Sequence, residues 1–115
     1  MRDFLTLDIW KISHLLTLEI YKVTKKFPKE ELFGLTSQMR RSVYSIPTNI
    51  AEGCGRNSNA QLVNFLQIAT GSCSEIQYQL MLSKELLCIT EELFSELHKE
   101  AVEIRKMIFK YSEKL

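Results

Sequence analysis

The residue types most often used for catalysis and metal binding are few in this chain and lie far apart. It has two histidines, His14 and His98, and three cysteines, Cys54, Cys73 and Cys88. Neither histidine has a partner at H-x-x-x-H or E-x-x-H spacing, and no two cysteines form a CxxC pair. We therefore expect a non-enzyme with no catalytic residue, metal site, cofactor or small-molecule substrate, and with reduced thiols.

The stretch Gly53-Cys54-Gly55-Arg56 is the other candidate for chemistry, because glycine-rich turns can bind phosphate. It follows a predicted helix instead of a strand, and it lacks a third glycine and a GK[ST] ending. Carbonyl groups at a helix C-terminus also repel anions. A turn between helices is the better interpretation, although Arg56 could still meet an anion. Arg56 would also lower the pKa of the Cys54 thiol, but a lone thiol is weak evidence for catalysis.

Length and composition indicate one helical domain spanning residues 1–115. Hydrophobic residues make up 45% of the 115 residues and charged residues 25%, enough to build a packed core. With 4 Gly and 2 Pro, the chain has too few turn-forming residues for a protein of many short strands. The net charge of +1 excludes a global positive field, so any nucleic-acid binding requires a local patch.

Apolar residues recur at steps of three and four in four segments, which predicts four helices. The first covers about residues 7–27, with Thr6 as its N-cap. It ends before Pro28, because the residue preceding a proline avoids helical geometry. Residues 28–35 form a connector in which we expect Gly34 to take the left-handed conformation.

The second helix is expected from near Thr36 to Gly53 or Gly55. Pro47 should kink it without dividing it, since the apolar stripe stays in register. One side carries a line of polar residues at helical spacing: Gln38, Arg41, Ser45, Asn49 and Glu52. A solvated face is the ordinary fate of such residues. We favour a hydrogen-bonded structural network.

Two further helices complete an antiparallel up-and-down four-helix bundle, which short connections favour. Ser58 and Gln61 form a capping box that opens a third helix of about thirty residues. Its predicted buried stripe is Leu62, Leu66, Ala69, Cys73, Ile76, Leu80, Ser83 and Leu87. Thr90 caps the fourth helix, whose stripe is Leu97, Ala101, Ile104, Ile108, Tyr111 and Leu115.

The third helix is unusual because no charged residue occurs between Asn57 and Ser74. Opposite its apolar stripe runs a second stripe of small or uncharged polar residues: Asn64, Gln67, Gly71, Ser74 and Tyr78. Such residues suit a second buried contact, which in a four-helix monomer would face solvent. We therefore predict a subunit interface there and a homo-oligomer. An exposed polar face is the alternative.

One long motif and its flanking residues carry a resemblance to a known family. The motif is Ser45-Ile46-Pro47-x-Asn49-Ile50-Ala51-Glu52-Gly53-x-Gly55-Arg56, flanked by Phe27, Pro28, Glu31, Gly34, Leu35, Gln38, Arg40, Arg41, Phe65, Ala69, Gly71, Ser72 and Glu75. From Trp10 to the last helix, the chain resembles the four-helix-bundle proteins encoded in bacterial 23S ribosomal RNA intervening sequences, also labelled S23 ribosomal proteins.

The resemblance implies an all-α bundle that assembles as a ring-shaped homopentamer. It also implies similarity to the accessory bundle protein of diversity-generating retroelements, which works with a reverse transcriptase and nucleic acid. The intervening-sequence family itself has no established activity. Its ribosomal name reflects gene location and does not make its members ribosome subunits.

Two function classes follow: a nucleic-acid-associated accessory protein and an oligomeric scaffold that binds protein partners. The first, which we favour slightly, rests on a possible RNA or DNA patch: Lys22, Lys25, Lys26, Lys29, Arg40 and Arg56.

Apolar runs of four or five residues are too short to span a membrane, which takes about 18 to 20. The charged N-terminal stretch does not read as a signal peptide, so we expect a cytoplasmic protein.

Overall fold

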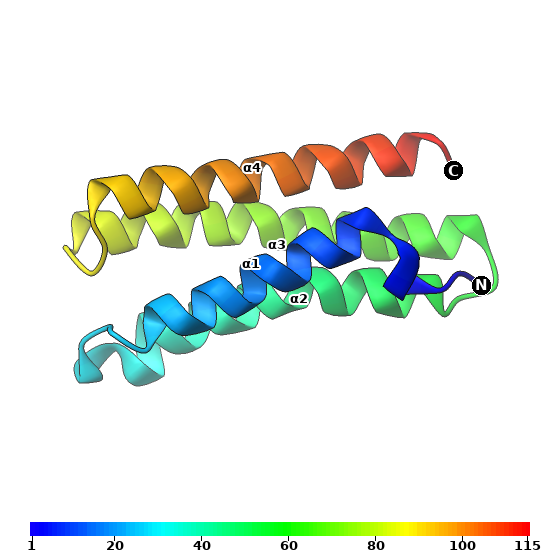
Figure 1. The fold of residues 1–115 in the computed structure, drawn as a ribbon. Coiled ribbons are helices and arrows are strands. Elements are labelled where there is room, and N and C mark those ends of the chain that lie inside the picture. The colour runs from blue at the N-terminus through cyan, green and yellow to red at the C-terminus, as the bar shows by residue number, and fades with distance from the viewer.

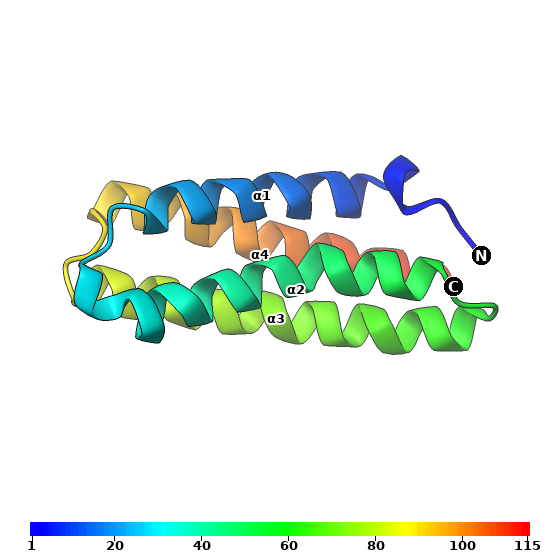
Figure 2. The same cartoon turned by 90° about the horizontal axis from the view of Figure 1, so that it is seen from below.

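Four long helices make up most of the chain; short turns join the second to the third and the third to the fourth, and a longer connector joins the first two helices (Figure 1). The computed structural model describes residues 1–115 and contains no strand. The helices are α1 (Asp8–Thr24), α2 (Ser37–Cys54), α3 (Asn59–Glu85) and α4 (Glu91–Glu113). Successive helices run in opposite directions, and both termini lie at the same end (Figures 1 and 2). The prediction of an all-α up-and-down four-helix bundle is confirmed.

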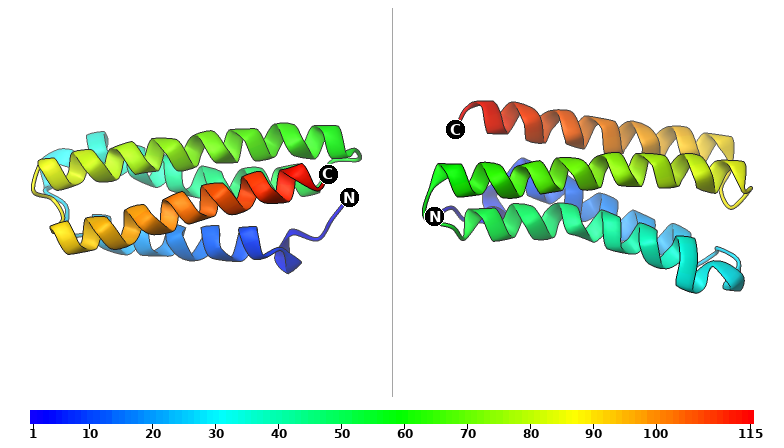
Figure 3. Two further views of the ribbon diagram at one scale, coloured as in Figure 1. Left: turned by 90° about the horizontal axis from the view of Figure 1, so that it is seen from above. Right: turned by 180° about the vertical axis from the view of Figure 1, so that it is seen from behind.

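The bundle is elongated, with principal extents of 43 × 24 × 19 Å. Helix α2 packs against α1 and α3, and α3 packs against α4. The pair α1 and α4 closes the bundle with the least contact, and the views from above and behind show all four helices running lengthwise (Figure 3). The face formed by α2 and α3 therefore lies opposite the one formed by α1 and α4.

The predicted N-cap of α1 is wrong. Thr6 lies inside a preceding 3-10 turn, Phe4–Thr6, which Asp3 caps by accepting a hydrogen bond from the backbone N–H of Leu5. Leu7 precedes α1 and makes no side-chain cap. The helix ends at Thr24, and hydrogen-bonded turns rather than α-helix continue the chain to Phe27.

The connector between α1 and α2 also differs from expectation. It contains a 3-10 turn, Lys29–Glu31, and a π-type turn, Leu32–Thr36. Gly34 has φ −110° and ψ −108°, so the predicted left-handed conformation is wrong. The Glu31 carboxylate instead accepts a hydrogen bond from the Leu35 N–H at 3.2 Å and closes the turn.

Helix α2 is a single helix that continues through Pro47 and ends at Cys54, with Gly55 as its C-cap. The predicted N-cap residues of the next two helices are confirmed, although the Gln61 side chain does not complete the capping box with the Ser58 N–H. Ser58 Oγ accepts from the Gln61 N–H at 3.2 Å, and Thr90 Oγ1 accepts from the Leu93 N–H at 3.1 Å. A hydroxyl at each N-cap therefore satisfies one of the free N–H groups of α3 and α4.

The core contains apolar side chains from all four helices, including Leu16, Ile46, Leu66 and Ile108. The predicted stripe of α3 is buried except for its last member. Leu87 is 88% exposed and has φ 64°, because α3 ends at Glu85 and the chain turns toward α4 there. None of the four helices combines the length and apolarity that a bilayer crossing requires.

Candidate functional surfaces

A basic end lies where α1 leads into α2, opposite the termini (Figure 1). It contains Lys22 in the last turn of α1 and Lys25, Lys26 and Lys29 in the exit from that helix. All four side chains are exposed. The two ion pairs of the structure, Arg56–Glu52 and Lys84–Glu91, involve none of them, although Glu30 and Glu31 follow Lys29 in the same turn.

Arg40 does not belong with these exposed lysines. Its Nε donates to Thr24 Oγ1 at 2.9 Å, and its Nη2 donates to the Tyr21 carbonyl at 3.3 Å. The guanidinium also lies 4.9 Å from the centre of the Tyr21 ring. These contacts hold the start of α2 against the end of α1 and leave Arg40 fewer free donors than the lysines, so its place in a nucleic-acid patch stays a prediction with less support.

Arg56 is also separated from the lysines, because it lies beside the α2–α3 turn at the opposite end of the bundle (Figure 2). Its Nη2 contacts Glu52 Oε1 at 2.8 Å, and its guanidinium covers the Phe65 ring at 4.9 Å. A neighbouring carboxylate offsets its charge. The six residues proposed from sequence therefore reduce to one cluster of four lysines.

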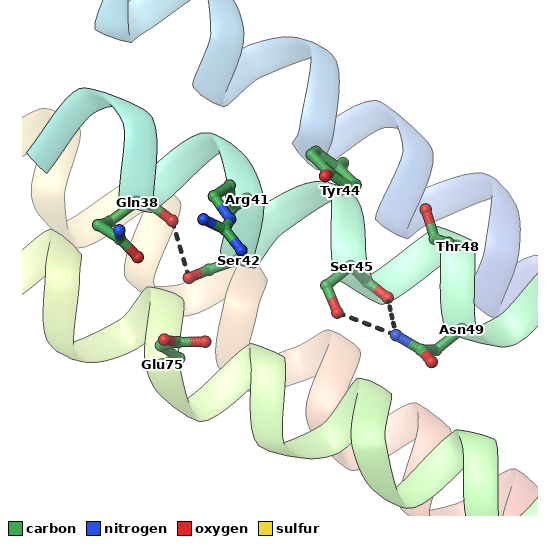
Figure 4. Close-up of a pocket in the computed structure, with 8 residues that line it drawn as sticks. All are labelled: Gln38, Arg41, Ser42, Tyr44, Ser45, Thr48, Asn49 and Glu75. Carbon is green, nitrogen blue, oxygen red and sulfur yellow. Dashed lines mark hydrogen bonds between the residues drawn. The ribbon is translucent and has the colours of Figure 1, made fainter. Parts of the chain in front are cut away.

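A polar groove of about 370 Å³ runs between α2 and α3 (Figure 4). Part of the polar line of α2 enters it, and Glu75 borders it from α3. Asn49 Nδ2 donates to the Ser45 carbonyl at 2.7 Å and to Ser45 Oγ at 2.9 Å. Ser72 of α3 donates to Ser45 Oγ at 2.8 Å, which links the two helices.

The five predicted network residues do not form one network within the chain. Ser45 and Asn49 are bonded to each other, whereas Glu52 turns to Arg56. Gln38 and Arg41 are exposed and make no side-chain hydrogen bond or ion pair within the fold. Within one chain the predicted network therefore does not include Gln38, Arg41 and Glu52, because the 3.6-residue period brings them to the outer side of α2, away from the core. A network at a subunit contact stays a prediction.

The second stripe of α3 lies on the same side of the molecule as the groove. All five of its residues, Asn64, Gln67, Gly71, Ser74 and Tyr78, are exposed. A β-carbon at Gly71 would meet nothing within 4 Å. We call this stripe, together with the polar line of α2, the α2–α3 face; Tyr44, Ile68 and Met81 add exposed apolar surface beside it.

The two histidines pack against aromatic rings, and Cys54 is buried. His14 stacks on Trp10 with ring centres 5.0 Å apart, and His98 lies beside Phe94 at the same separation. No three His, Cys, Asp or Glu side chains are placed to hold a metal ion. Burial raises the pKa of the Cys54 thiol and outweighs the opposing effect of Arg2, so the expected lowering by Arg56 is wrong.

Sequence reasoning missed a groove between α1 and α4. A cavity of about 240 Å³ there is lined by apolar side chains and three carboxylates. The available signal was the group of three leucines, Leu15, Leu16 and Leu18, which fall on more than one side of α1. Only Leu16 is buried in the core, and the other two are exposed.

The fold defines a small all-α four-helix bundle. The chain belongs to the 23S rRNA-intervening sequence protein family, whose sequence profile matches residues 5–110. A similar solved structure is a protein of unknown function from the S23 ribosomal protein family of Bacteroides thetaiotaomicron. It is 27% identical with a TM-score of 0.81, and the match covers 90% of this chain and 97% of that chain. A comparison with curated proteins gives no match.

Proposed function

We propose that this chain is a non-enzymatic cytoplasmic protein that assembles as a ring-shaped homopentamer and associates with structured RNA or DNA. The observation that carries the proposal is the basic end, where Lys22, Lys25, Lys26 and Lys29 are exposed and unpaired. Cations near a helix C-terminus also stabilise the helix dipole. That effect accounts for one or two lysines more easily than for four.

Assembly strengthens the proposal because one cluster of four lysines binds a polyanion weakly. A chain with a net charge of +1 has no strong long-range attraction for nucleic acid. Five copies of the basic end in one particle would bind one nucleic acid at several points, and avidity multiplies modest affinities of this kind. An oligomer would therefore give the weak lysine clusters a useful combined affinity for nucleic acid.

The α2–α3 face supports the oligomer. It lacks lysine from Ser37 to Ser83, and its exposed Tyr44, Tyr78 and Met81 belong to the residue types enriched at protein interfaces. Gly71 leaves room for close approach of another backbone, because nothing in its own chain fills that space. A face of this composition suits contact with protein better than with solvent.

The test combines particle mass with a gel-shift titration of structured RNA and duplex DNA. The unmodified chain should give the mass of a pentamer by light scattering and should retain nucleic acid at low salt. Retention should fall steeply as salt rises, because each phosphate contact releases counterions. The triple variant Lys22→Gln, Lys25→Gln, Lys26→Gln should bind less at unchanged mass.

A matched control removes the same charge elsewhere. Lys99, Lys106 and Lys110 are exposed on α4, so their triple glutamine variant has the same net charge as the first variant. It should bind nucleic acid like the unmodified chain. Equal loss in both triple variants would show a general charge effect, and no retention by the unmodified chain would exclude nucleic-acid association.

The second candidate function is an oligomeric scaffold for protein partners. Phe33 is 91% exposed and Leu87 is 88% exposed, and both lie in turns at the end of the bundle that carries the lysines. Exposed large apolar side chains of this kind are common where another protein binds. A pentamer that fails to retain RNA and DNA would favour this function.

A further inference from the structure

The seam between α1 and α4 is open along much of its length. Its first cavity, of about 240 Å³, is bordered by Leu15 on α1 and by Glu100 and Met107 on α4. A second, of about 440 Å³, shares Met107 and continues toward Lys110 and Lys114. We call the two cavities together the α1–α4 groove.

The floor and edge of the α1–α4 groove are apolar and open to solvent. Leu15 is 57% exposed and Met107 is 39% exposed, while Ile12 and Ile104 line the cavity between them. A contiguous apolar surface beside a cavity is typical of a site that another protein segment covers.

Three carboxylates border the same cavity: Glu19 from α1, and Glu100 and Glu103 from α4. None forms an ion pair, since both ion pairs of the structure lie elsewhere. Glu100 Oε2 is buried without a hydrogen-bond donor. Burial, reinforced by the charges of Glu19 and Glu96, raises the pKa of Glu100 to about 7. Glu100 also shares its proton with Glu19 through a side-chain hydrogen bond. A cation placed here would meet carboxyl groups that no base of the chain pairs with.

We propose that the α1–α4 groove binds a basic amphipathic helix of a partner protein. Its apolar side packs on Leu15 and Met107, and its lysines or arginines meet Glu19, Glu100 and Glu103. A helix laid in a groove is a common mode of peptide recognition and uses apolar anchors at helical spacing. This site is separate from the basic end and does not depend on nucleic-acid binding.

The groove also sets the length and direction of the helix. It follows α4 from Glu100 to Lys114, which at about 1.5 Å per residue is about 21 Å, or four turns. Three glutamates and no base line one end, whereas Lys110 and Lys114 outnumber the single carboxylate, Asp8, at the other. The partner helix therefore has about 15 residues, with its basic residues concentrated in one half.

A second copy of this chain fits the groove less well. The α2–α3 face, which we assign to subunit contacts, offers Arg41 as its one arginine without a carboxylate partner. Its outer stripe on α3 has no base to meet three carboxylates. Charge complementarity therefore favours a different, basic protein segment.

The test uses a labelled 15-residue helical peptide with leucines at i, i+3, i+4 and i+7 and three lysines in one half. Its binding to the full chain in its native assembly is followed by fluorescence anisotropy. Binding should saturate and should weaken about tenfold in Leu15→Ser and in Glu103→Lys. A peptide with glutamates in place of the lysines should bind poorly to the unmodified chain and better to Glu103→Lys.

Control variants distinguish peptide binding in the α1–α4 groove from non-specific binding elsewhere on the surface. Leu86→Ser and Glu85→Lys make the same changes at exposed positions near the α3–α4 turn and should leave binding unchanged. The lysine-to-glutamine variant of the basic end should also bind the peptide normally. Circular dichroism and melting curves establish that each variant is folded.

Three results would overturn the proposal. One is equal binding of a scrambled peptide of the same composition without an apolar face. Another is unchanged affinity in both groove variants. The third is a loss of particle mass in Leu15→Ser when the unmodified assembly does not bind the peptide, because a second copy would then cover the groove.

Discussion

Gly53 on α2 lies so close to α3 that a β-carbon there would come within 2.8 Å of Leu62 Cδ1. The same β-carbon would lie 2.9 Å from Phe65 Cβ, which is fixed to the backbone and cannot rotate away. The absence of a side chain at Gly53 therefore sets the spacing of α2 and α3 near the turn that joins them.

We predict that Gly53→Ala lowers the free energy of unfolding. Alanine gains about 1 kcal/mol in helix propensity, but overpacking of this kind costs about 1 to 3 kcal/mol, so the net effect should be destabilising. Gly71→Ala is the matched control, because its β-carbon meets nothing within 4 Å and the propensity gain remains. Urea titration of both variants checks the pair, and a stabilised Gly53→Ala would contradict the prediction.

Gly71→Leu should reduce the oligomer mass without unfolding the chain. The open space around Gly71 means that leucine fits the isolated bundle, whereas a packed subunit contact would be forced apart. Light scattering measures the mass, and circular dichroism measures the helix content. An unchanged mass would place Gly71 on a solvent-exposed face and would remove this part of the α2–α3 face from the subunit contact.

Arg40→Ala should destabilise the fold by about 1 to 2 kcal/mol, because it removes two hydrogen bonds to α1 and the contact with the Tyr21 ring. Arg40→Lys should recover little of this loss, since a lysine ammonium cannot reproduce the planar guanidinium, whose Nε and Nη2 donate to two acceptors at once. Lys11→Ala, at an exposed position on α1, serves as the control and should change stability by less than about 0.5 kcal/mol. Thermal melting that ranks Arg40→Ala with Lys11→Ala would contradict this role.

Glu100 should make stability depend on pH. Burial, with Glu19 as its neighbour, raises the carboxyl pKa from the ordinary value of 4.5 to about 7. The folded chain thus binds the proton more tightly than the unfolded chain. The contribution is complete below about pH 4.5 and is lost as the pH rises through 7.

Glu100→Gln should therefore be more stable than the unmodified chain at pH 8, by about 1 to 2 kcal/mol after solvent screening is taken into account. At pH 4 the two should be nearly equal. Denaturant titrations at both pH values measure the difference, with Glu85→Gln as an exposed control. An equal offset at both pH values would show that the carboxyl does not titrate in this range.

The helices and most of the core could be predicted because burial imposes the 3.6-residue period on α2, α3 and α4. Caps such as Ser58 and Thr90 were predictable for a similar reason, since one hydroxyl and one N–H three residues later determine them. The errors fall where local chemistry has several solutions. Near Gly34 the Glu31 carboxylate closes the turn, and near Thr6 the aspartate of an earlier turn takes the capping role.

The roles of the surface residues were harder to predict, because a sequence pattern does not determine which hydrogen-bond or ion-pair partner a polar side chain will have. Arg40 and Arg41 are adjacent in sequence, yet the helix turns one toward Tyr21 and the other to solvent. Glu52 pairs with Arg56 four residues later instead of joining Asn49. The α1–α4 groove depends on how two helices at opposite ends of the chain approach each other, which no local spacing reveals.

Both termini emerge at the end of the bundle opposite the lysine-bearing connector (Figures 1 and 2). In any cyclic assembly whose axis follows the helices, symmetry carries this polarity to the whole particle. One rim then holds every chain end, and the other holds every copy of the basic end. A label or fused domain on either terminus would project from the first rim, leaving the second free to meet a flat or extended polyanion.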